Sequence, residues 1–461
     1  MSIVGAVIVP HPPAILPEVG RGQEAELAKT AAAFQTAAGR LASWAPDTLV
    51  FFSPHTVAYQ DYFHISPGSR AEGNFAQFGT PSLRLEAEYD AELVERICVH
   101  TRNGMLPAGT FGEQDPALDH GVAVPLYFFQ KELPDCKIVR IGLSGMTPLD
   151  HYRMGKCVAA AAGDLGRRVA IVASGDLSHK LKEDGPYGFA PQGPVFDEQI
   201  IRAMAAGDFL SFLTMDETFA MEAAQCGLNA FQMMAGALDG RSVEPELLSY
   251  EGPFGVGYAV GVFAAGAEDP ARRMDEAYQT YMYEASAGQR AAEDAYVRLA
   301  RLGLETYVNT GRRAELPADL PDEMTGARAG VFVSIHQGGR LRGCIGTVYP
   351  VTRSVAEEIL RNAVAAGHED NRFPPVRKEE LVTLTYSVDV LGVSETVYSR
   401  EDLDPKRYGV VVTGGRRRGL LLPNLDGVET VEQQLEIACQ KAGIDVDSSY
   451  TMERFEVVRH G

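Results

Sequence analysis

Four histidines lie at the ends of apolar segments in the first half of the chain. His11 follows the run VIVP, His55 follows VFFSP, and His179 closes the segment IVASGDLSH. His120 opens the helical or strand segment HGVAVPLYFF. Imidazole is the commonest metal ligand and also transfers protons near neutral pH. Two histidines with an anionic third ligand leave positions on iron for substrate and oxygen, and the two remaining histidines could act as acid and base.

The elements that must hold these histidines are apolar strands that alternate with helices. The predicted strands span residues 3–9, 48–53, 137–142 and 168–173. Helical patterns lie between them, for example at residues 24–44 and 91–103. Nearly continuous apolar strands alternating with helices indicate an α/β domain whose central sheet is covered on both faces. Chemistry in such sheets lies beyond the carboxyl ends of the strands, so we expect the histidines to meet at one edge.

The second half of the chain has its strands and helices in separate blocks, which is typical of a smaller α+β domain. Helices are predicted at residues 288–309, 354–367 and 430–442. A strand is predicted at residues 381–391, with hairpins at residues 330–346 and 409–422. The second hairpin turns at Gly414-Gly415, a pair suited to positive φ.

The length of the chain and a change in composition predict two domains. A chain of 461 residues is too long for one ordinary core. The last buried strand of the first half is predicted at residues 255–265, and a Gly- and Ala-rich polar stretch follows at residues 266–270. Such stretches are typical of domain boundaries. We therefore predict one domain at residues 1–268 and a second at residues 275–461.

The composition argues against several classes of partner and site. A net charge of −20 argues against nucleic acid as a partner, because phosphate binding needs clustered positive charge. The sequence has no stretch of about 18 apolar residues, so we predict no membrane helix. The N-terminus also lacks the basic start of a signal peptide. We therefore expect a cytoplasmic protein. The six cysteines contain no CxxC pair, which argues against a disulfide framework and a structural zinc site.

The segments around the four histidines resemble a known family. VPHPP, SPH, DHGVAVPL and SGDLSH are similar to motifs of the class III extradiol dioxygenases of the LigB type and of the related Memo family, over roughly residues 3 to 265. The resemblance implies a non-haem ferrous ion bound by His11 and His55, with His120 and His179 in the pocket of a small-molecule substrate. His179 corresponds to the acid–base residue of the family. Asp176 either orients His179 or caps the turn that follows.

The third metal ligand has three candidates. Ring-cleaving members of the family have a glutamate about ten residues before a GAL-type helix end, where Memo proteins have a cysteine. Counting back from Gly236-Ala237-Leu238 leads to Cys226, which we rank first, ahead of Glu222 and Glu251. A thiolate is softer than a carboxylate and suits zinc as well as iron. It therefore weakens the expectation of catechol ring cleavage.

The second half resembles the AMMECR domain family, over roughly residues 275 to 459. LRGCIGT is the most specific segment, and RFPPV and GLLLP follow in the expected order. Cys344 in the first segment is a candidate nucleophile or ligand, since Arg342 and Arg340 beside it could stabilise a thiolate. Arg372, which precedes FPPV, is a further candidate, and its alternative is pairing with a neighbouring acid.

A chain that combines these two domains resembles the AmmeMemoRadiSam proteins. This implies a separate radical SAM protein as a partner, because the six cysteines contain no CxxxCxxC cluster motif. The first hypothesis is an Fe(II)-dependent oxidoreductase that acts on a small aromatic or otherwise chelating substrate. The second is a metal-binding accessory protein of the radical SAM partner, without turnover of its own. The third is a zinc-dependent hydrolase or nucleotide-modifying enzyme that uses the same pocket.

Overall fold

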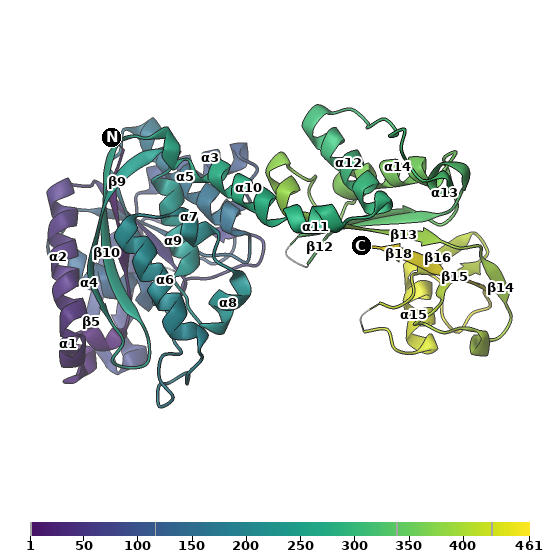
Figure 1. Ribbon diagram of the computed structural model, residues 1–461. Helices are drawn as coiled ribbons and strands as arrows, with labels where there is room; N and C mark the ends of the chain where they lie inside the picture. Colours follow the sequence, from purple (N-terminus) through teal and green to yellow (C-terminus); the bar gives the residue numbers. More distant parts are fainter. Residues whose placement is uncertain (1, 116, 338–339, 426) are drawn as a thin grey trace. The chain divides into compact units, whose positions relative to one another are not determined.

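The computed structural model describes all residues except 1, 116, 338–339 and 426. The chain divides into two compact units, residues 1–278 and residues 279–461. Figure 1 shows the first unit in purple to teal and the second in green to yellow. No helix in the described part of the chain has both the length and the apolar content that crossing a membrane requires.

The first unit is built on a six-stranded sheet with the order β7-β2-β8-β1-β10-β9. Its strands are β1 (Ile3–Val9), β2 (Thr48–Ser53), β7 (Lys137–Gly142), β8 (Val169–Ser174), β9 (Arg241–Glu251) and β10 (Tyr258–Glu268). Strands β7, β2, β8 and β1 are parallel, whereas β10 and β9 are antiparallel to their neighbours. Every residue of β1, β2 and β8 is buried. Such strands read as unbroken apolar runs because both of their faces are covered.

Helices cover both faces of this sheet (Figure 1). The helices of the first unit are α1 (Pro17–Gly20), α2 (Ala28–Trp44), α3 (Ala91–Asn103), α4 (His120–Phe129), α5 (Pro148–Leu165), α6 (Gln192–Ala206), α7 (Leu210–Leu213), α8 (Glu217–Glu222) and α9 (Leu228–Ala237). Helices α2 and α4 pack on one face, while α5, α6 and α9 pack on the other. Helix α10 (Met274–Ala285) continues from this unit into the second.

Four further strands in the described part of the first unit lie outside the central sheet. They are β3 (Phe63–His64), β4 (Arg70–Phe75), β5 (Thr80–Glu88) and β6 (Ala108–Gly109). Strands β4 and β5 form an antiparallel hairpin, and β3 pairs with β6. The residues of β4 alternate between exposed and buried, so one side of the hairpin faces water. Residues 73 and 74 of this hairpin line the pocket described below.

The second unit contains two four-stranded sheets, with the orders β12-β11-β13-β18 and β14-β17-β15-β16. Its strands are β11 (Val331–Gln337), β12 (Arg340–Thr347), β13 (Leu384–Leu391), β14 (Glu395–Val397), β15 (Gly409–Gly414), β16 (Arg417–Leu421), β17 (Thr451–Phe455) and β18 (Val457–His460). Its helices are α11 (Ala287–Ala292), α12 (Ala295–Thr310), α13 (Asp322–Gly326), α14 (Val355–His368) and α15 (Val431–Ala442). Helices α12 and α14 pack on the first sheet and α15 packs on the second.

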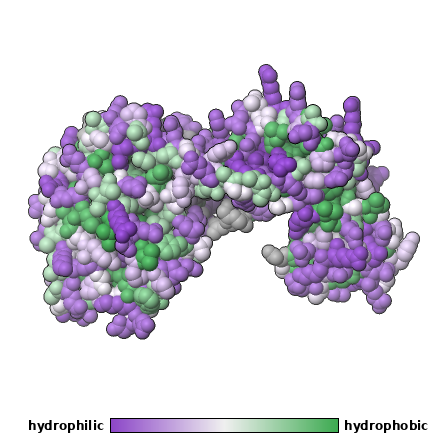
Figure 2. Space-filling model, in the orientation of Figure 1, coloured by the Kyte–Doolittle hydropathy of each residue, from purple (hydrophilic) through white to green (hydrophobic). Residues whose placement is uncertain are grey.

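The structure confirms the predicted fold class, an α/β domain with a central sheet followed by an α+β domain. Both predicted hairpins are present, although the turn of the first, residues 338–339, lies outside the described residues. The predicted helix at residues 288–309 is instead two helices, α11 and α12, separated at Glu293-Asp294. Asp294 accepts hydrogen bonds from the backbone of α12 and begins a new helix there. In Figure 2 the visible face of each unit is mainly hydrophilic, with separate apolar patches.

Candidate metal centre

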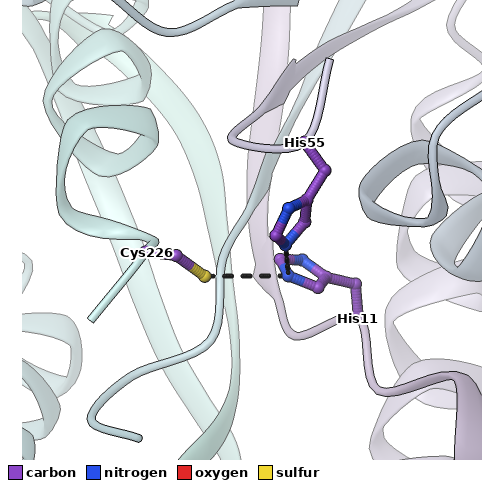
Figure 3. A group of neighbouring side chains, drawn as sticks. All are labelled: His11, His55 and Cys226. Atoms are coloured by element: carbon purple, nitrogen blue, oxygen red, sulfur yellow. Dashed lines mark hydrogen bonds between the residues drawn. The ribbon is translucent and has the colours of Figure 1, made fainter. Parts of the chain in front are cut away.

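Three potential metal ligands from separate segments meet in the first unit (Figure 3). His11 follows β1, His55 follows β2, and Cys226 lies just before α9. One donor atom from each of these side chains lies within 4.8 Å of the other two. The two histidine Nε2 atoms are 2.9 Å apart, and the Cys226 Sγ is 3.7 Å from the Nε2 of His11. Two nitrogens and a sulfur at this spacing suit one transition-metal ion.

The side chain of Ser174, the last residue of β8, sets the orientation of the His11 ring. Its Oγ lies 2.9 Å from the Nδ1 of His11 and donates a hydrogen bond of 2.5 Å to the carbonyl of Gly121. The hydroxyl proton is used for the carbonyl, so the Oγ accepts the proton on Nδ1. The Nε2 of His11 then carries the free lone pair that a metal requires. Hydrogen bonds of this kind fix the tautomer of metal-binding histidines.

A network at the start of α4 holds the backbone beside His55. The Oγ of Ser53 accepts a hydrogen bond of 3.3 Å from the backbone N–H of His55 and donates one of 2.6 Å to Asp119. The same Asp119 carboxylate accepts a hydrogen bond from the backbone N–H of Val122 and caps α4. A Cβ on Gly121 would lie 2.3 Å from the Oγ of Ser53. Gly121, the glycine of the segment DHGVAVPL, is therefore needed for this network to form.

Cys226 reaches the histidines because two glycines let the backbones of β8 and α9 approach closely. A Cβ on Gly175 would lie 2.1 Å from the Cα of Gly227. The backbone N–H of Asp176 donates to the Cys226 Sγ at 3.3 Å, and the backbone N–H of Cys226 donates to the carbonyl of Asp176 at 3.3 Å. A hydrogen-bond donor at the sulfur favours the thiolate form that binds metals.

His179 and Asp176 form an acid–base pair next to the three donor atoms. The Nδ1 of His179 donates to the backbone carbonyl of Ala224, and its Nε2 lies 3.7 Å from the Asp176 carboxylate. Asp176 also accepts a hydrogen bond of 2.8 Å from the backbone N–H of His11. Asp176 is therefore oriented toward His11 and His179. Among the described residues, its carboxylate accepts no hydrogen bond from the turn that follows, which favours the orienting role over the capping role.

Burial and charge give the imidazoles different protonation states. Burial lowers the pKa of His11 to about 3, although Asp176 opposes this. The pKa of His55 is lowered to about 4, first by partial burial of its ring and then by the nearby His120. Burial also disfavours the charged form of His179, but the interaction with Asp176 outweighs it and raises the pKa. At neutral pH, His11 and His55 are therefore uncharged, as metal ligands must be.

His120 connects the three donors to a pocket. Its ring stacks on His55 with centroids 4.0 Å apart, and burial lowers its pKa. Beside the two rings is an open pocket of about 620 Å³. Its lining is mixed: apolar residues such as Val57 and Leu118 alternate with the polar side chains of Glu72, Asn74, Gln77, Glu113, Asp115, Asp119 and Arg140.

The two glutamates predicted as alternative third ligands lie elsewhere. Glu222 is exposed at the end of α8. The helix ends there and Ala224 has a φ of 53°, so Glu222 and Cys226 do not share a helical face as expected. The carboxylate of Glu251 accepts hydrogen bonds from the backbone and side chain of Thr30, at 2.8 and 2.6 Å. Neither residue belongs to the group formed by the three donors.

Sequence reasoning did not identify several residues around this centre. Ser174 opens the SGDLSH motif but was not given a role, and Arg140 lies within the apolar strand β7, where no motif marks it. Tyr258 opens β10 and is buried. Burial and then the nearby Asp176 raise its pKa, and Cys226 acts in the same direction. The Tyr187 ring is 5.0 Å from the ring of His179 and is exposed. Gly175 in SGD and Gly227 after Cys226 were the available signals for the approach of the Cys226 loop.

The candidates of the second unit have a different environment from the one expected. Arg342 forms an ion pair with Glu380 at 2.8 Å and does not contact the thiol of Cys344. The side chain of Arg340 lies outside the described residues. Arg372 pairs with Asp370 at 2.6 Å and donates to the backbone carbonyl of Cys344 at 3.1 Å. The pairing of Arg372 with a neighbouring acid is therefore correct, and Arg342 is not the cation beside the thiol.

Known families and relatives match both units. The family described as the catalytic LigB subunit of aromatic ring-opening dioxygenase matches residues 5–261, and the AMMECR1 family matches residues 297–460. A protein from Clostridium acetobutylicum is 41% identical over 100% of this chain and 99% of its own length. A protein from Thermotoga maritima is 47% identical, covering 36% of this chain and 98% of its own. The crystal structure of an uncharacterized protein from Pyrococcus horikoshii is 32% identical and covers 36% of this chain and 88% of that chain, with a TM-score of 0.34.

Proposed function

The chain belongs to the family of the catalytic LigB subunit of aromatic ring-opening dioxygenases, with an AMMECR1 domain after it, and from this we propose that it is a non-haem Fe(II)-dependent oxidoreductase. The observation that carries the proposal is the meeting of His11, His55 and Cys226, whose donor atoms lie within 4.8 Å of one another. In the proposed site these three side chains hold the metal. When bound, iron supplies open coordination positions and a one-electron redox couple.

The fit of this donor set to a metal rests on the surrounding contacts. The imidazoles of His11 and His55 have lowered pKa values and are uncharged at neutral pH. Burial raises the pKa of the Cys226 thiol, so the thiol carries its proton at neutral pH. It must release that proton when a cation binds. The backbone N–H of Asp176 then stabilises the thiolate. Zinc suits the same donors, and iron is proposed because the family is one of dioxygenases.

The remaining side chains supply acid–base chemistry. His179 accepts a proton from a substrate hydroxyl at its Nε2, because its Nδ1 proton is held by the carbonyl of Ala224. Asp176 stabilises the charged ring that results. His120 is uncharged at neutral pH, since burial lowers its pKa, and it donates a hydrogen bond to a developing oxyanion.

The pocket indicates the kind of substrate. Its volume of about 620 Å³ suits a small molecule. Carboxylates and amides line it beside His55 and His120, so a substrate with several hydrogen-bond donors fits better than an apolar ring. We propose a small aromatic or otherwise chelating substrate that carries hydroxyl or amino groups.

The sulfur donor favours a second candidate function. A cysteine in place of a carboxylate makes the site softer and open to oxidation, which suits catechol cleavage less well. The second candidate is a metal-binding accessory protein of a separate radical SAM enzyme. It predicts tight metal binding, no oxygen consumption with any substrate, and a stable complex with that enzyme.

Oxygen uptake after anaerobic iron loading distinguishes the two functions. We expect uptake with at least one member of a panel of catechols, aminophenols and hydroxy acids, and its loss in His179→Ala with iron still bound. His100→Ala is the matched control, since His100 contacts Asp164 on the surface. Iron binding without uptake across the panel would refute the oxidoreductase and favour the accessory function. Failure to bind iron or zinc would refute both.

A further inference from the structure

The second unit has a polar group of side chains around Cys344 that the proposed function does not use. Cys344 on β12 pairs with Ser334 on the neighbouring strand β11. The Ser334 hydroxyl donates a hydrogen bond of 3.2 Å to the Cys344 Sγ. The adjacent Gly343 packs against the carbonyl of Ala366 in α14. Because successive strand residues face opposite sides, the thiol lies on the sheet face away from α14.

A buried carboxylate fixes one cation beside this thiol. Asp370 is buried and accepts a hydrogen bond of 2.9 Å from the backbone N–H of Cys344. It also binds the Arg372 guanidinium through two hydrogen bonds, at 2.9 and 2.6 Å. The same guanidinium donates to the carbonyl of Cys344 at 3.1 Å. Arg372 is half exposed, so one side of it remains available to a ligand.

A second cation comes from a distant part of the sequence. Lys441 lies near the end of α15, close enough to Cys344 and to Arg372 for charge interactions with both. Partial burial and then the Arg372 charge lower the pKa of Lys441, while the thiol opposes them. Within the described part of the chain, no carboxylate pairs with Lys441. Lys441 therefore adds a second cation in the neighbourhood of the thiol, and its ammonium group is available to an anionic ligand.

Cations also lie near other thiols, for example Arg153 and Lys156 near Cys157, but burial is the dominant influence there. Burial raises the pKa of the remaining five thiols, which are Cys98, Cys136, Cys157, Cys226 and Cys439. Cys344 is only partly buried, accepts a hydroxyl hydrogen bond and has cations nearby. Cations and hydrogen-bond donors near a partly exposed thiol are the conditions that make a cysteine nucleophilic.

We propose that Cys344, Ser334, Arg372 and Lys441 form a second reactive site, in which Cys344 is a nucleophile toward an electrophile that carries a carboxylate or phosphate group. The cations bind the anionic group and bring the electrophilic carbon to the sulfur. The Sγ–C bond forms as the bond between that carbon and its leaving group breaks. The leaving group departs with the electron pair, and the thiol proton passes to water. The site does not depend on the metal centre of the first unit.

Alkylation by two reagents of different charge tests this site in the intact chain. Iodoacetate carries a carboxylate and iodoacetamide is its neutral analogue, and each forms a carbon–sulfur bond with release of iodide. We would measure both rates at every cysteine by peptide mass spectrometry, which makes the other five thiols internal controls. Cys344 is expected to react fastest. Its ratio of iodoacetate to iodoacetamide rates should exceed that of free glutathione by about threefold to tenfold.

Variants of Lys441 identify the source of the charge preference. Lys441→Gln should bring the rate ratio at Cys344 close to the glutathione value, and Lys441→Arg should retain most of it. Lys406→Gln is the matched control, because Lys406 is exposed in the same unit and pairs with Glu429 at 2.8 Å. A ratio equal to that of glutathione in the wild type would overturn the proposal. So would a ratio that Lys441→Gln leaves unchanged.

Discussion

At the scale of single residues, one hydroxyl group determines which nitrogen of His11 is available. The Oγ of Ser174 accepts a hydrogen bond from the Nδ1–H of His11 and donates one to the carbonyl of Gly121. Without the hydroxyl, the ring loses the contact that selects its tautomer and its orientation. Residues that orient a metal-binding histidine in this way contribute to its affinity for the metal.

Ser174→Ala should therefore weaken metal binding roughly 10- to 100-fold. The affinity would be measured anaerobically by competition with a chelator. Ser43→Ala is the matched control, since the Ser43 hydroxyl donates a hydrogen bond to the backbone carbonyl of Arg40 in its own helix. An unchanged affinity in Ser174→Ala would contradict the role assigned to this hydroxyl.

The pair Asp176–His179 predicts a pH dependence. The interaction with Asp176 raises the pKa of His179, so the ring is charged below that pKa and acts as a base only above it. Asp176→Asn removes the negative charge and should move the titration of His179 to lower pH. The ring would be followed by NMR through its carbon-bound protons in the metal-free protein. A titration at unchanged or higher pH in this variant would show that Asp176 does not stabilise the charged ring.

At the scale of elements, two loops bring the ligands together only because glycines let them touch. Gly175 directly follows β8, and Gly227 precedes α9. Any side chain at either position would separate Cys226 from His11. The close contact of these two loops is thus as necessary to the centre as the ligands.

Gly175→Ala should destabilise the first unit by about 1–3 kcal/mol, because its Cβ would overlap the Cα of Gly227. It should also reduce the metal content. Gly39→Ala is the control, since a Cβ on Gly39 in α2 would meet no atom within 4 Å, and it should leave stability unchanged or raise it by up to about 1 kcal/mol. Urea denaturation and metal analysis check both variants. Equal stabilities would contradict the packing argument.

The elements also show how far the sequence predicts the structure. The predicted bounds of β1, β2 and β7 agree with the structure because buried strands are continuous apolar runs. Strand β9 was not predicted, because it lies at the edge of the sheet and carries polar residues throughout. The hairpin of β4 and β5 was missed because polar residues interrupt both of its strands.

The site was predictable only where a residue type carries its own chemical signal. Histidines at strand ends could be recognised from the residues alone, whereas Cys226 was identified through the family resemblance. The approach of Arg372 and Lys441 to Cys344 could not, because it joins residues that lie far apart in the sequence. The sequence neighbour Arg342 was a reasonable alternative, but the structure uses it for an ion pair with Glu380.

At the scale of the whole molecule, all the groups of the candidate metal centre belong to the first unit, residues 1–278. The start of α10 also belongs to it, because Asp275 pairs with Lys156 at 2.7 Å. The backbone N–H of Met274 donates to the hydroxyl of Tyr152 at 3.0 Å. A fragment that contains the whole first unit must therefore include Met274 and Asp275.

A fragment of residues 1–278 should fold and bind metal with the stoichiometry and affinity of the full chain. A fragment of residues 1–268 should be less stable, because it lacks the partners of Lys156 and Tyr152 in α10. Thermal denaturation and metal titration of the two fragments and the full chain would compare them. Loss of metal binding in the longer fragment would mean that the second unit contributes to the centre.

The most direct test of the central claim is X-ray absorption at the iron edge after anaerobic loading of the full chain. The claim is that His11, His55 and Cys226 hold one metal ion. We predict one sulfur and two imidazole nitrogens among the nearest neighbours of iron, and loss of the sulfur in Cys226→Ala, with Cys98→Ala unchanged. A coordination shell without sulfur in the wild type, or one that Cys226→Ala leaves intact, would contradict the account.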